Sequence, residues 1–173
     1  MNLSEQLAEW ESFYVAAAGA AAVLLGLVFV ALSLHFERHR GRLRVRGLAI
    51  QSAASLFYAL LVSLLMLVPE GRPTSQGVTL LVVSLFGIWT SAVAFGEAHR
   101  SKTALVSLVF RFALPLTMML VLLVAAVLLL AGVRLGVWLV AAVVFFHILL
   151  GTQNAWDLFL GAGSSDAVDG PAA

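Results

Sequence analysis

The chain has 173 residues, of which 62% are hydrophobic and only 11% are charged. Soluble domains carry about 25% charged residues, so this composition excludes an ordinary soluble protein. Apolar runs of about 20 residues recur, and a helix needs that length to cross a hydrocarbon core of roughly 30 Å. The chain contains no cysteine, which excludes disulfides and thiol chemistry. The sequence therefore predicts an all-α, polytopic membrane protein whose main partner is the lipid bilayer.

The first thirteen residues carry Glu5, Glu9 and Glu11 and no basic side chain. Leu3 and Leu7, with Trp10 and Tyr14 after them, fall at helical spacing, which predicts a short amphipathic turn before the first span. A cleaved secretory signal would begin with basic residues and have a shorter apolar core. The first span is therefore expected to stay in the membrane.

Five apolar segments follow in one predicted transmembrane domain over residues 1–160. Proline and glycine separate the second segment from the third, and a tight turn is expected at Gly132 to Gly136. The tail, residues 161–173, consists mainly of small residues with two aspartates, and it is predicted to be disordered and cytoplasmic. The five expected spans are at about 14–34, 48–68, 78–95, 112–131 and 137–157.

Three of these spans carry stripes of small or weakly polar residues at helical spacing. Such stripes let helix backbones approach closely in lipid, where no hydrophobic force drives helices together. We therefore expect these faces to pack against other helices. The stripes are Ala18, Ala22 and Gly26 in the first span, Ser52, Ser55, Ala59 and Ser63 in the second, and Ser84, Gly87 and Ser91 in the third.

The segment His35–Gly47 separates the first two spans and is predicted to be an arginine-rich loop. Basic loops beside apolar spans stay in the cytoplasm, and each arginine near an anionic leaflet contributes about 1 kcal/mol. With this loop inside, eight basic residues lie inside and two, Arg72 and Arg134, lie outside. The count predicts an outside N-terminus and an inside C-terminus. The loop residues expected to contact lipid headgroups are Arg38, Arg40, Arg42, Arg44 and Arg46.

His147 lies at the midpoint of the last span, where an ionisable residue is costly and is a functional candidate. Asn154 shares its helical face, since seven residues return to the same side. One interpretation is a polar path that also involves Ser55 and Ser91. The other is a neutral histidine that holds helices together by one hydrogen bond. The structural interpretation is favoured, because no second ionisable residue lies at the same depth.

A metal site is the weaker alternative for the histidines outside the spans. His35 and His39 are four residues apart, and Glu97 and His99 end the third span, so these four are the candidate ligands. The spacing differs from the H-E-x-x-H pattern, and intervening arginines oppose a cation. We therefore predict no bound metal and no cofactor. The sequence Glu37–Arg40 is similar to Glu97–Arg100, sixty residues later, with Glu, His and Arg at matching positions. This similarity suggests a duplicated two-helix hairpin plus one extra helix.

Catalysis is not expected, because the sequence has no nucleophile motif, no pair of carboxylates at membrane depth and no phosphate-binding glycine loop. Nucleic-acid binding is not expected either, since a 13-residue basic loop beside a span is more simply a topology anchor. The arginine-rich, lysine-poor composition indicates a bacterium, so the predicted location is a bacterial plasma (inner) membrane.

The stretch Trp10–Leu34, with its Gly26–Leu34 ending, resembles a group of small bacterial multi-spanning membrane proteins. The N-A-W of Asn154–Trp156 is also similar to these proteins. Most are uncharacterised, and some carry the label modulator of the FtsH protease. The resemblance implies no catalytic residue. It agrees with a non-enzymatic accessory or regulatory subunit that packs against itself or a larger membrane complex, with a small oligomeric channel or transporter at His147 as the alternative.

Overall fold

The structure is a computed structural model that describes residues 3–35, 43–68, 73–100 and 113–166, with side chains described for 5, 7–33, 49–68, 74–93 and 113–156. All elements in these ranges are helices, as the sequence predicts. Four of them, α2, α3, α4 and α7, are long and apolar enough to cross a membrane, and α6 is a shorter apolar helix. The helices are α1 (Leu3–Glu9), α2 (Glu11–His35), α3 (Leu43–Met66), α4 (Pro73–Arg100), α6 (Leu114–Leu130) and α7 (Leu135–Asp166).

Several helices extend beyond the predicted spans. The expected arginine loop ran to Gly47, but α3 already begins at Leu43, so that prediction was wrong for residues 43–47. The hydrocarbon core sets a minimum length for a span, and a helix can continue past it while long basic side chains reach the headgroups. Similarly, α4 begins at Pro73 instead of residue 78, because proline suits the first turn of a helix.

The end of α7 also differs from the prediction. Residues 161–166, which were predicted to be disordered, are helical, and the helix ends at Asp166. Leu158, Phe159 and Leu160 continue the helical sequence without a break, and no proline intervenes before Pro171. The rest of the predicted tail, 167–173, lies outside the described residues.

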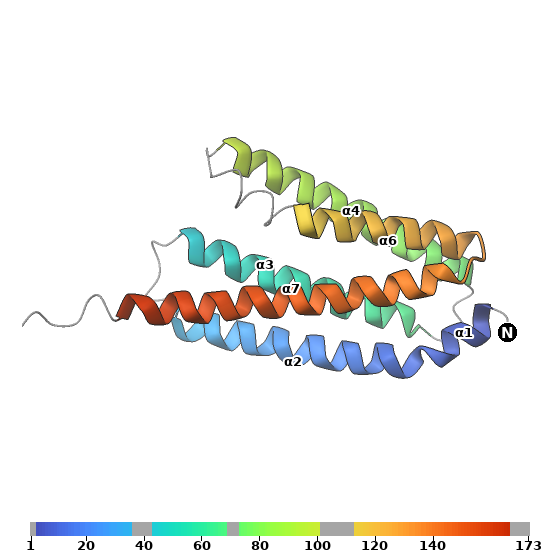
Figure 1. Cartoon of the computed structure of the whole chain (residues 1–173), viewed down its shortest axis with the longest axis horizontal. Helices are drawn as coiled ribbons and strands as arrows, with labels where there is room; N and C mark the ends of the chain where they lie inside the picture. Colours follow the sequence, from blue (N-terminus) through green and yellow to red (C-terminus); the bar gives the residue numbers. More distant parts are fainter. Residues whose placement is uncertain (1–2, 36–42, 69–72, 101–112, 167–173) are drawn as a thin grey trace, which may run out of the picture.

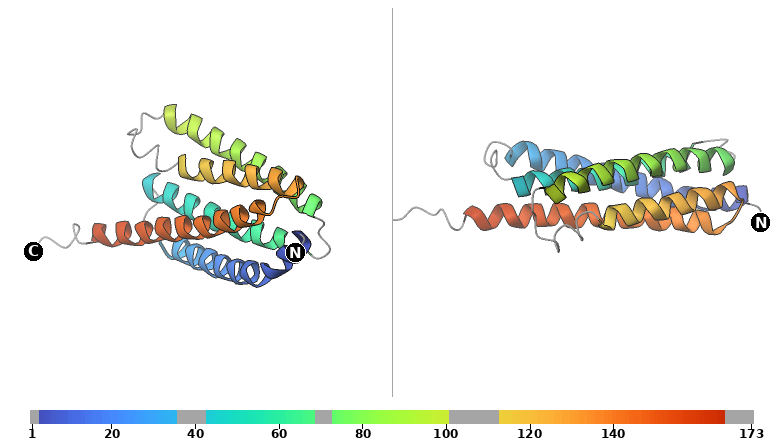
Figure 2. Two further views of the ribbon diagram at one scale, coloured as in Figure 1. Left: turned by 45° about the vertical axis from the view of Figure 1, so that its right-hand side comes forward. Right: turned by 90° about the horizontal axis from the view of Figure 1, so that it is seen from above.

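The last helix in the sequence lies between two helical hairpins. Helix α2 packs on α3, α4 packs on α6, and α7 packs on both α3 and α6, whereas α3 and α4 have little contact. Figure 1 shows α4 and α6 together along one side and α2 along the other, with α3 and α7 between them. Seen from above, α6 and α7 lie in one layer (Figure 2). The arrangement agrees with two hairpins and one extra helix, and it makes α7 the central element.

Two glycines bring α7 close to its neighbours. A Cβ atom built on Gly151 would lie 2.6 Å from Leu56 Cγ and 3.3 Å from the Ser52 carbonyl oxygen of α3. One built on Gly136 would lie 2.9 Å from the Ala125 carbonyl oxygen of α6. Any residue larger than glycine would therefore push α7 away from α3 at position 151 and away from α6 at position 136. These two glycines set the distances between the helix axes in the bundle.

The turn between α6 and α7 fixes how the chain reverses. Gly132 has φ of 75°, a left-handed conformation that residues with a side chain rarely adopt. The Gly132 N–H bonds to the Leu129 carbonyl at 3.0 Å, and the Val133 N–H bonds to the Leu128 carbonyl at 2.8 Å. These two bonds form a Schellman motif, which satisfies carbonyls that the end of α6 would leave free. The tight turn predicted at Gly132 to Gly136 is confirmed.

Aromatic residues mark the two ends of the bundle. Trp10 packs edge-on against Trp138 with ring centroids 4.7 Å apart, and Tyr14 donates a 3.5 Å hydrogen bond to the Val137 carbonyl. We call this the Trp10 end, and we call the other end the Trp156 end. Trp138 and Trp156 are separated by about 27 Å of helix, close to the roughly 30 Å of a hydrocarbon core. Both tryptophans are exposed, as membrane-interface aromatics are.

The close contact at Gly151 generates the first prediction. Gly151→Val should destabilise the bundle by roughly 1–3 kcal/mol, because the added side chain overlaps Leu56 and the backbone of α3. Gly26→Val is the matched control, since a Cβ at Gly26 meets nothing within 4 Å. Unfolding by a denaturing detergent, followed by tryptophan fluorescence under conditions that keep the chain monomeric, measures the difference. Equal stability of the two variants would contradict the close packing of Gly151 against α3.

Candidate functional site

Polar side chains are buried in the interior, mainly on the faces of α3 and α4 that the stripes predicted. The α3 stripe is confirmed as an internal face, and on α4 Ser84 and Gly87 are buried while Ser91 is half-buried. The α2 stripe behaves differently, because Ala18 is buried but Ala22 and Gly26 are exposed. The polar residues buried in the described part of the chain are Ser52, Ser55, Ser63, Gln76, Ser84 and His147.

His147 is only 2% exposed and faces α3 from the middle of α7. Its Nδ1 lies 2.9 Å from the Val143 carbonyl oxygen of its own helix. A carbonyl has no hydrogen to donate, so Nδ1 carries the hydrogen, and in the neutral imidazole Nε2 is an acceptor. The imidazole ring packs against Tyr58 of α3 with centroids 6.1 Å apart at 61°. The histidine therefore joins α7 to α3 by ring packing, while its hydrogen bond stays within α7.

Tyr58 and Thr90 connect α3 to α4 at the depth of His147. The Thr90 hydroxyl donates to the Gly87 carbonyl at 3.0 Å, which uses its single hydrogen. Tyr58 Oη lies 3.5 Å from Thr90 Oγ1, so Tyr58 is the donor of this bond. The bond is one of few contacts between α3 and α4, and it leaves the lone pairs of the tyrosine oxygen free to accept.

Ser52 makes a short side-chain hydrogen bond from α3 to α7. Its hydroxyl donates to the Gly151 carbonyl oxygen at 2.6 Å, and the serine is fully buried. The bond requires the close approach that Gly151 permits. This bond holds α7 against α3 at Gly151, one helical turn from His147.

Two buried polar atoms lie nearer the Trp10 end. Gln76 is 7% exposed, and its Nε2 donates to the Met66 carbonyl at 3.3 Å. Within the described residues, Gln76 Oε1 and the hydroxyl of the fully buried Ser63 have no hydrogen-bond partner. Buried polar atoms in folded proteins are bonded to protein groups or to ordered water in the great majority of cases.

The predicted polar path is assembled only in part. Ser55 is buried and Asn154 and Ser91 are half-buried, but no hydrogen bond among the described side chains joins them to His147. The partners of the central site are instead Tyr58 and Thr90. Tyr58 could have been found from its sequence position, because it lies three residues from Ser55 in a span otherwise rich in serine. Thr90 gave no such signal, because its depth relative to His147 depends on how α4 packs.

The remaining predicted site residues fall outside the described side chains. Arg38, Arg40, Arg42 and His39 lie outside the described residues. Arg44, Arg46, His35, Glu97 and His99 lie on described helices, but their side chains are not described. Among the described residues, no group of three or more potential ligands could hold a metal ion.

No family model, curated protein or solved structure matches this chain.

The bond between Ser52 and Gly151 generates the second prediction. Ser52→Ala should lower stability by about 0.6 kcal/mol, the average measured for hydrogen bonds between membrane helices, and by no more than about 1.7 kcal/mol. Ser33→Ala is the control, because the exposed Ser33 hydroxyl bonds to the Phe29 carbonyl of its own helix. The two serine variants are compared by the same detergent unfolding assay. A loss no larger in Ser52→Ala than in Ser33→Ala would show that the α3–α7 bond contributes nothing to stability.

Proposed function

We propose that this protein is a non-enzymatic integral membrane protein that acts as an accessory or regulatory subunit. It packs through α2 against a second copy of itself or against a larger membrane complex. The resemblance noted in Trp10–Leu34 suggests a membrane protease as one such complex, in the plasma membrane of a bacterium. The observation that carries the proposal is the outward face of α2.

This face, which we call the α2 small face, consists of Gly19, Ala22, Gly26 and Ser33. All four residues are exposed, and a Cβ on Gly19 or Gly26 would meet nothing within 4 Å. They share one side of the helix, because their spacings of three, four and seven residues return to the same direction. From Gly19 to Ser33 the face is about 21 Å long, most of the depth of a bilayer core.

The other described glycines within helices indicate what this face is for. Gly77 and Gly87 of α4, and Gly136 and Gly151 of α7, all lie against a neighbouring helix more closely than a Cβ would allow. Among the helical glycines whose surroundings the structure describes, only Gly19 and Gly26 of α2 face outward. Lipid tails are contacted equally well by large side chains, whereas small residues favour contact with another helix. The α2 small face therefore supports packing against a partner in the membrane.

We also propose five spans with the N-terminus outside and the C-terminus inside. Helix α4 runs toward the Trp156 end and α7 starts at the Trp10 end, so α6 must return along the bundle between them (Figure 1). Its 17 described residues extend about 26 Å, slightly less than a typical core. Pro115 lies in the first turn of α6, where a missing N–H is tolerated. The orientation is supported by the excess of basic residues on one side.

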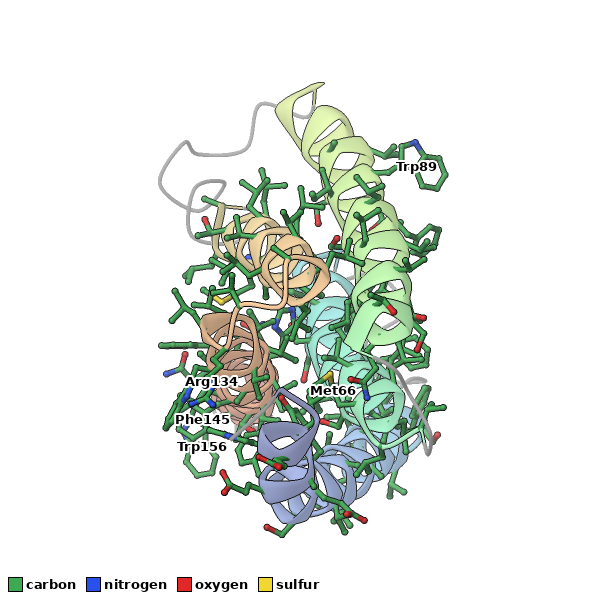
Figure 3. The ribbon with its side chains drawn as sticks, turned by 90° about the vertical axis from the view of Figure 1, so that its right-hand side faces the viewer. Met66, Trp89, Arg134, Phe145 and Trp156 are labelled. Atoms are coloured by element: carbon green, nitrogen blue, oxygen red, sulfur yellow. The ribbon has the colours of Figure 1, made fainter. Side chains whose placement is uncertain are left out.

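The lipid-facing side chains agree with this placement. Figure 3 looks along the bundle from the Trp10 end and shows Trp89 of α4 pointing away from the other helices, with Phe145 and Trp156 on the outer side of α7. These side chains are 63%, 53% and 64% exposed, respectively. In water they would be an aggregation hazard, and in a bilayer they face lipid.

The alternative, an oligomeric channel or transporter with a polar path at His147, is less well supported. The hydroxyls of Ser52 and Thr90 are bonded to helix carbonyls, and His147 Nδ1 is bonded to its own helix. The Ser52 bond joins α3 to α7, and the other two satisfy polar groups within their own helices, so each of these hydrogens is already used inside the bundle.

The association through α2 is the third prediction. Gly26→Leu should weaken self-association of the protein in liposomes by at least about tenfold, because a leucine keeps the partner backbone away. Energy transfer between copies labelled at the C-terminus measures the association. Ala20→Leu is the matched control, since Ala20 is equally small and exposed on α2 but lies off the α2 small face.

For a complex with another membrane protein, the same two variants are compared by co-purification in mild detergent. Gly26→Leu should lose the partner and Ala20→Leu should keep it. Recovery of the unmodified protein alone in every preparation, with no self-association in liposomes, would refute the proposed function.

The orientation gives the fourth prediction. A green fluorescent protein fused to the C-terminus should fluoresce, and alkaline phosphatase at the same place should be inactive, because an odd number of spans places the C-terminus inside. The same two reporters inserted between Val68 and Pro73 should give the reverse pattern. An active phosphatase at the C-terminus would mean that one of the five helices does not cross the membrane.

A further inference from the structure

We propose that a second copy of this chain covers the α2 small face, and that it does so with the large side chains on the outer side of its own α4. This inference rests on the proposed function and names the partner of that same surface. Copies of the protein would then join head to tail in the plane of the membrane.

The large side chains concerned are Phe86, Trp89 and Val93, which we call the α4 ridge. They are 57%, 63% and 48% exposed, and Trp89 points away from the other helices (Figure 3). The rings of Phe86 and Trp89 lie together, with centroids 5.9 Å apart. Spacings of three and four residues place all three side chains on one side of the helix. The α4 ridge is therefore a continuous apolar projection from the bundle.

Trp89 lies at a depth where tryptophan is seldom found facing lipid. Its neighbour Thr90 is bonded to Tyr58, whose ring packs on His147, and His147 is midway along α7 between the exposed tryptophans of the two ends. Lipid-facing tryptophans are enriched at the membrane interfaces, where water and headgroups accept their N–H. Hydrocarbon at the midplane offers no acceptor, and an N–H without one is costly there. Contact with another helix would therefore stabilise Trp89 more than contact with lipid.

Helix α2 has an opening that fits such a side chain. Gly19, Ala22, Val23 and Gly26, which we call the α2 hole, are all exposed and have the spacing of the four residues that surround an inserted side chain in helix packing. A Cβ on either glycine would meet nothing within 4 Å, so the centre of the α2 hole is open. Small residues leave the backbone uncovered, and a helix carbonyl has a second lone pair that can accept the indole N–H.

The α2 hole and the α4 ridge lie at the same depth in the membrane. The hydrogen bond from Tyr14 to Val137 fixes the level of α2 relative to α7. From Val137 to His147, which marks the depth of Trp89, the distance along α7 is about 15 Å. The same distance of about 15 Å along α2 from Tyr14 ends inside the α2 hole.

The positions of the two helices determine the kind of assembly. Helices α2 and α4 both run from the Trp10 end to the Trp156 end, so two copies inserted the same way present them in parallel (Figure 1). They lie on opposite sides of the bundle, so one copy cannot fill its own hole. A projection on one side and a hole on the other make a heterologous interface, which repeats into a ring or a chain. Contact of α2 with α2 would instead be two-fold and would stop at a dimer.

The test uses two variants that each lose one half of the interface. Gly26→Leu fills the α2 hole and keeps the α4 ridge, whereas Trp89→Ala removes the centre of the ridge and keeps the hole. Each variant alone should self-associate at least about tenfold more weakly than the unmodified protein in liposomes, since a tryptophan anchor carries much of the binding energy of an interface. Energy transfer between copies labelled at the C-terminus measures the association.

Mixing the two variants should restore the energy transfer, because the ridge of Gly26→Leu fits the hole of Trp89→Ala. The mixture should stop at pairs with one copy of each variant. Phe145→Ala is the matched control, since Phe145 is a similarly exposed aromatic residue on α7, outside the α4 ridge, and its loss should leave self-association unchanged. Detergent unfolding checks that each variant keeps the stability of the unmodified protein.

The outcomes distinguish this inference from the proposed function. Normal self-association of Trp89→Ala, with loss in Gly26→Leu, would overturn the role of α4 and indicate a two-fold contact through α2. No recovery in a mixture of two stable variants would also overturn head-to-tail joining. Absence of self-association in the unmodified protein would overturn the inference, while a complex with another membrane protein would remain and be detected by co-purification. Normal self-association of Gly26→Leu would refute the α2 small face itself.

Discussion

The structure depends on the close packing of α7 between two hairpins that have little contact with each other. Gly151 lets α7 approach α3, and Gly136 lets it approach α6. Without these approaches, the Ser52 hydroxyl could not reach the Gly151 carbonyl. In lipid, where burial of apolar surface gives no net driving force, this geometric fit and a few hydrogen bonds hold the helices in one arrangement.

The same constraint separates the internal faces of the helices from the external ones. On α3, α4 and α7, several small and hydroxyl-bearing residues face neighbouring helices, among them Ser52, Gly87 and Gly151, while Trp89, Phe145 and Trp156 face outward. Helix α2 differs in its glycines: its buried side includes Tyr14, Ala17 and Ala21, whereas Gly19 and Gly26 face outward. The contrast between the packed glycines of α4 and α7 and the exposed glycines of α2 therefore marks the surface that the proposed partner would cover.

Much of the fold could be predicted from the sequence because hydrophobic length and turn residues are local properties. The four long helices, the turn at Gly132 and the inward stripe of α3 followed from them. Helix ends at residues 43–47 and 161–166 did not, because lipid sets a minimum length for a span but no maximum. The partners of His147 were also missed. The tilt and rotation of α3 and α4 decide which hydroxyl lies at the depth of His147. Packing contacts such as Gly87 on Met119 set this tilt and rotation.

The order of helices across the bundle has a consequence for the way the protein is made. Both hairpins precede α7 in the chain, so each leaves the ribosome and enters the membrane before the helix that connects them exists. Until α7 arrives, Ser52, Leu56 and Tyr58 on one hairpin and Ala125 and Leu129 on the other lack their contacts with it. Packing of the two hairpins into one bundle is consequently delayed until α7 has been made, and during that interval the two halves are open to other membrane proteins.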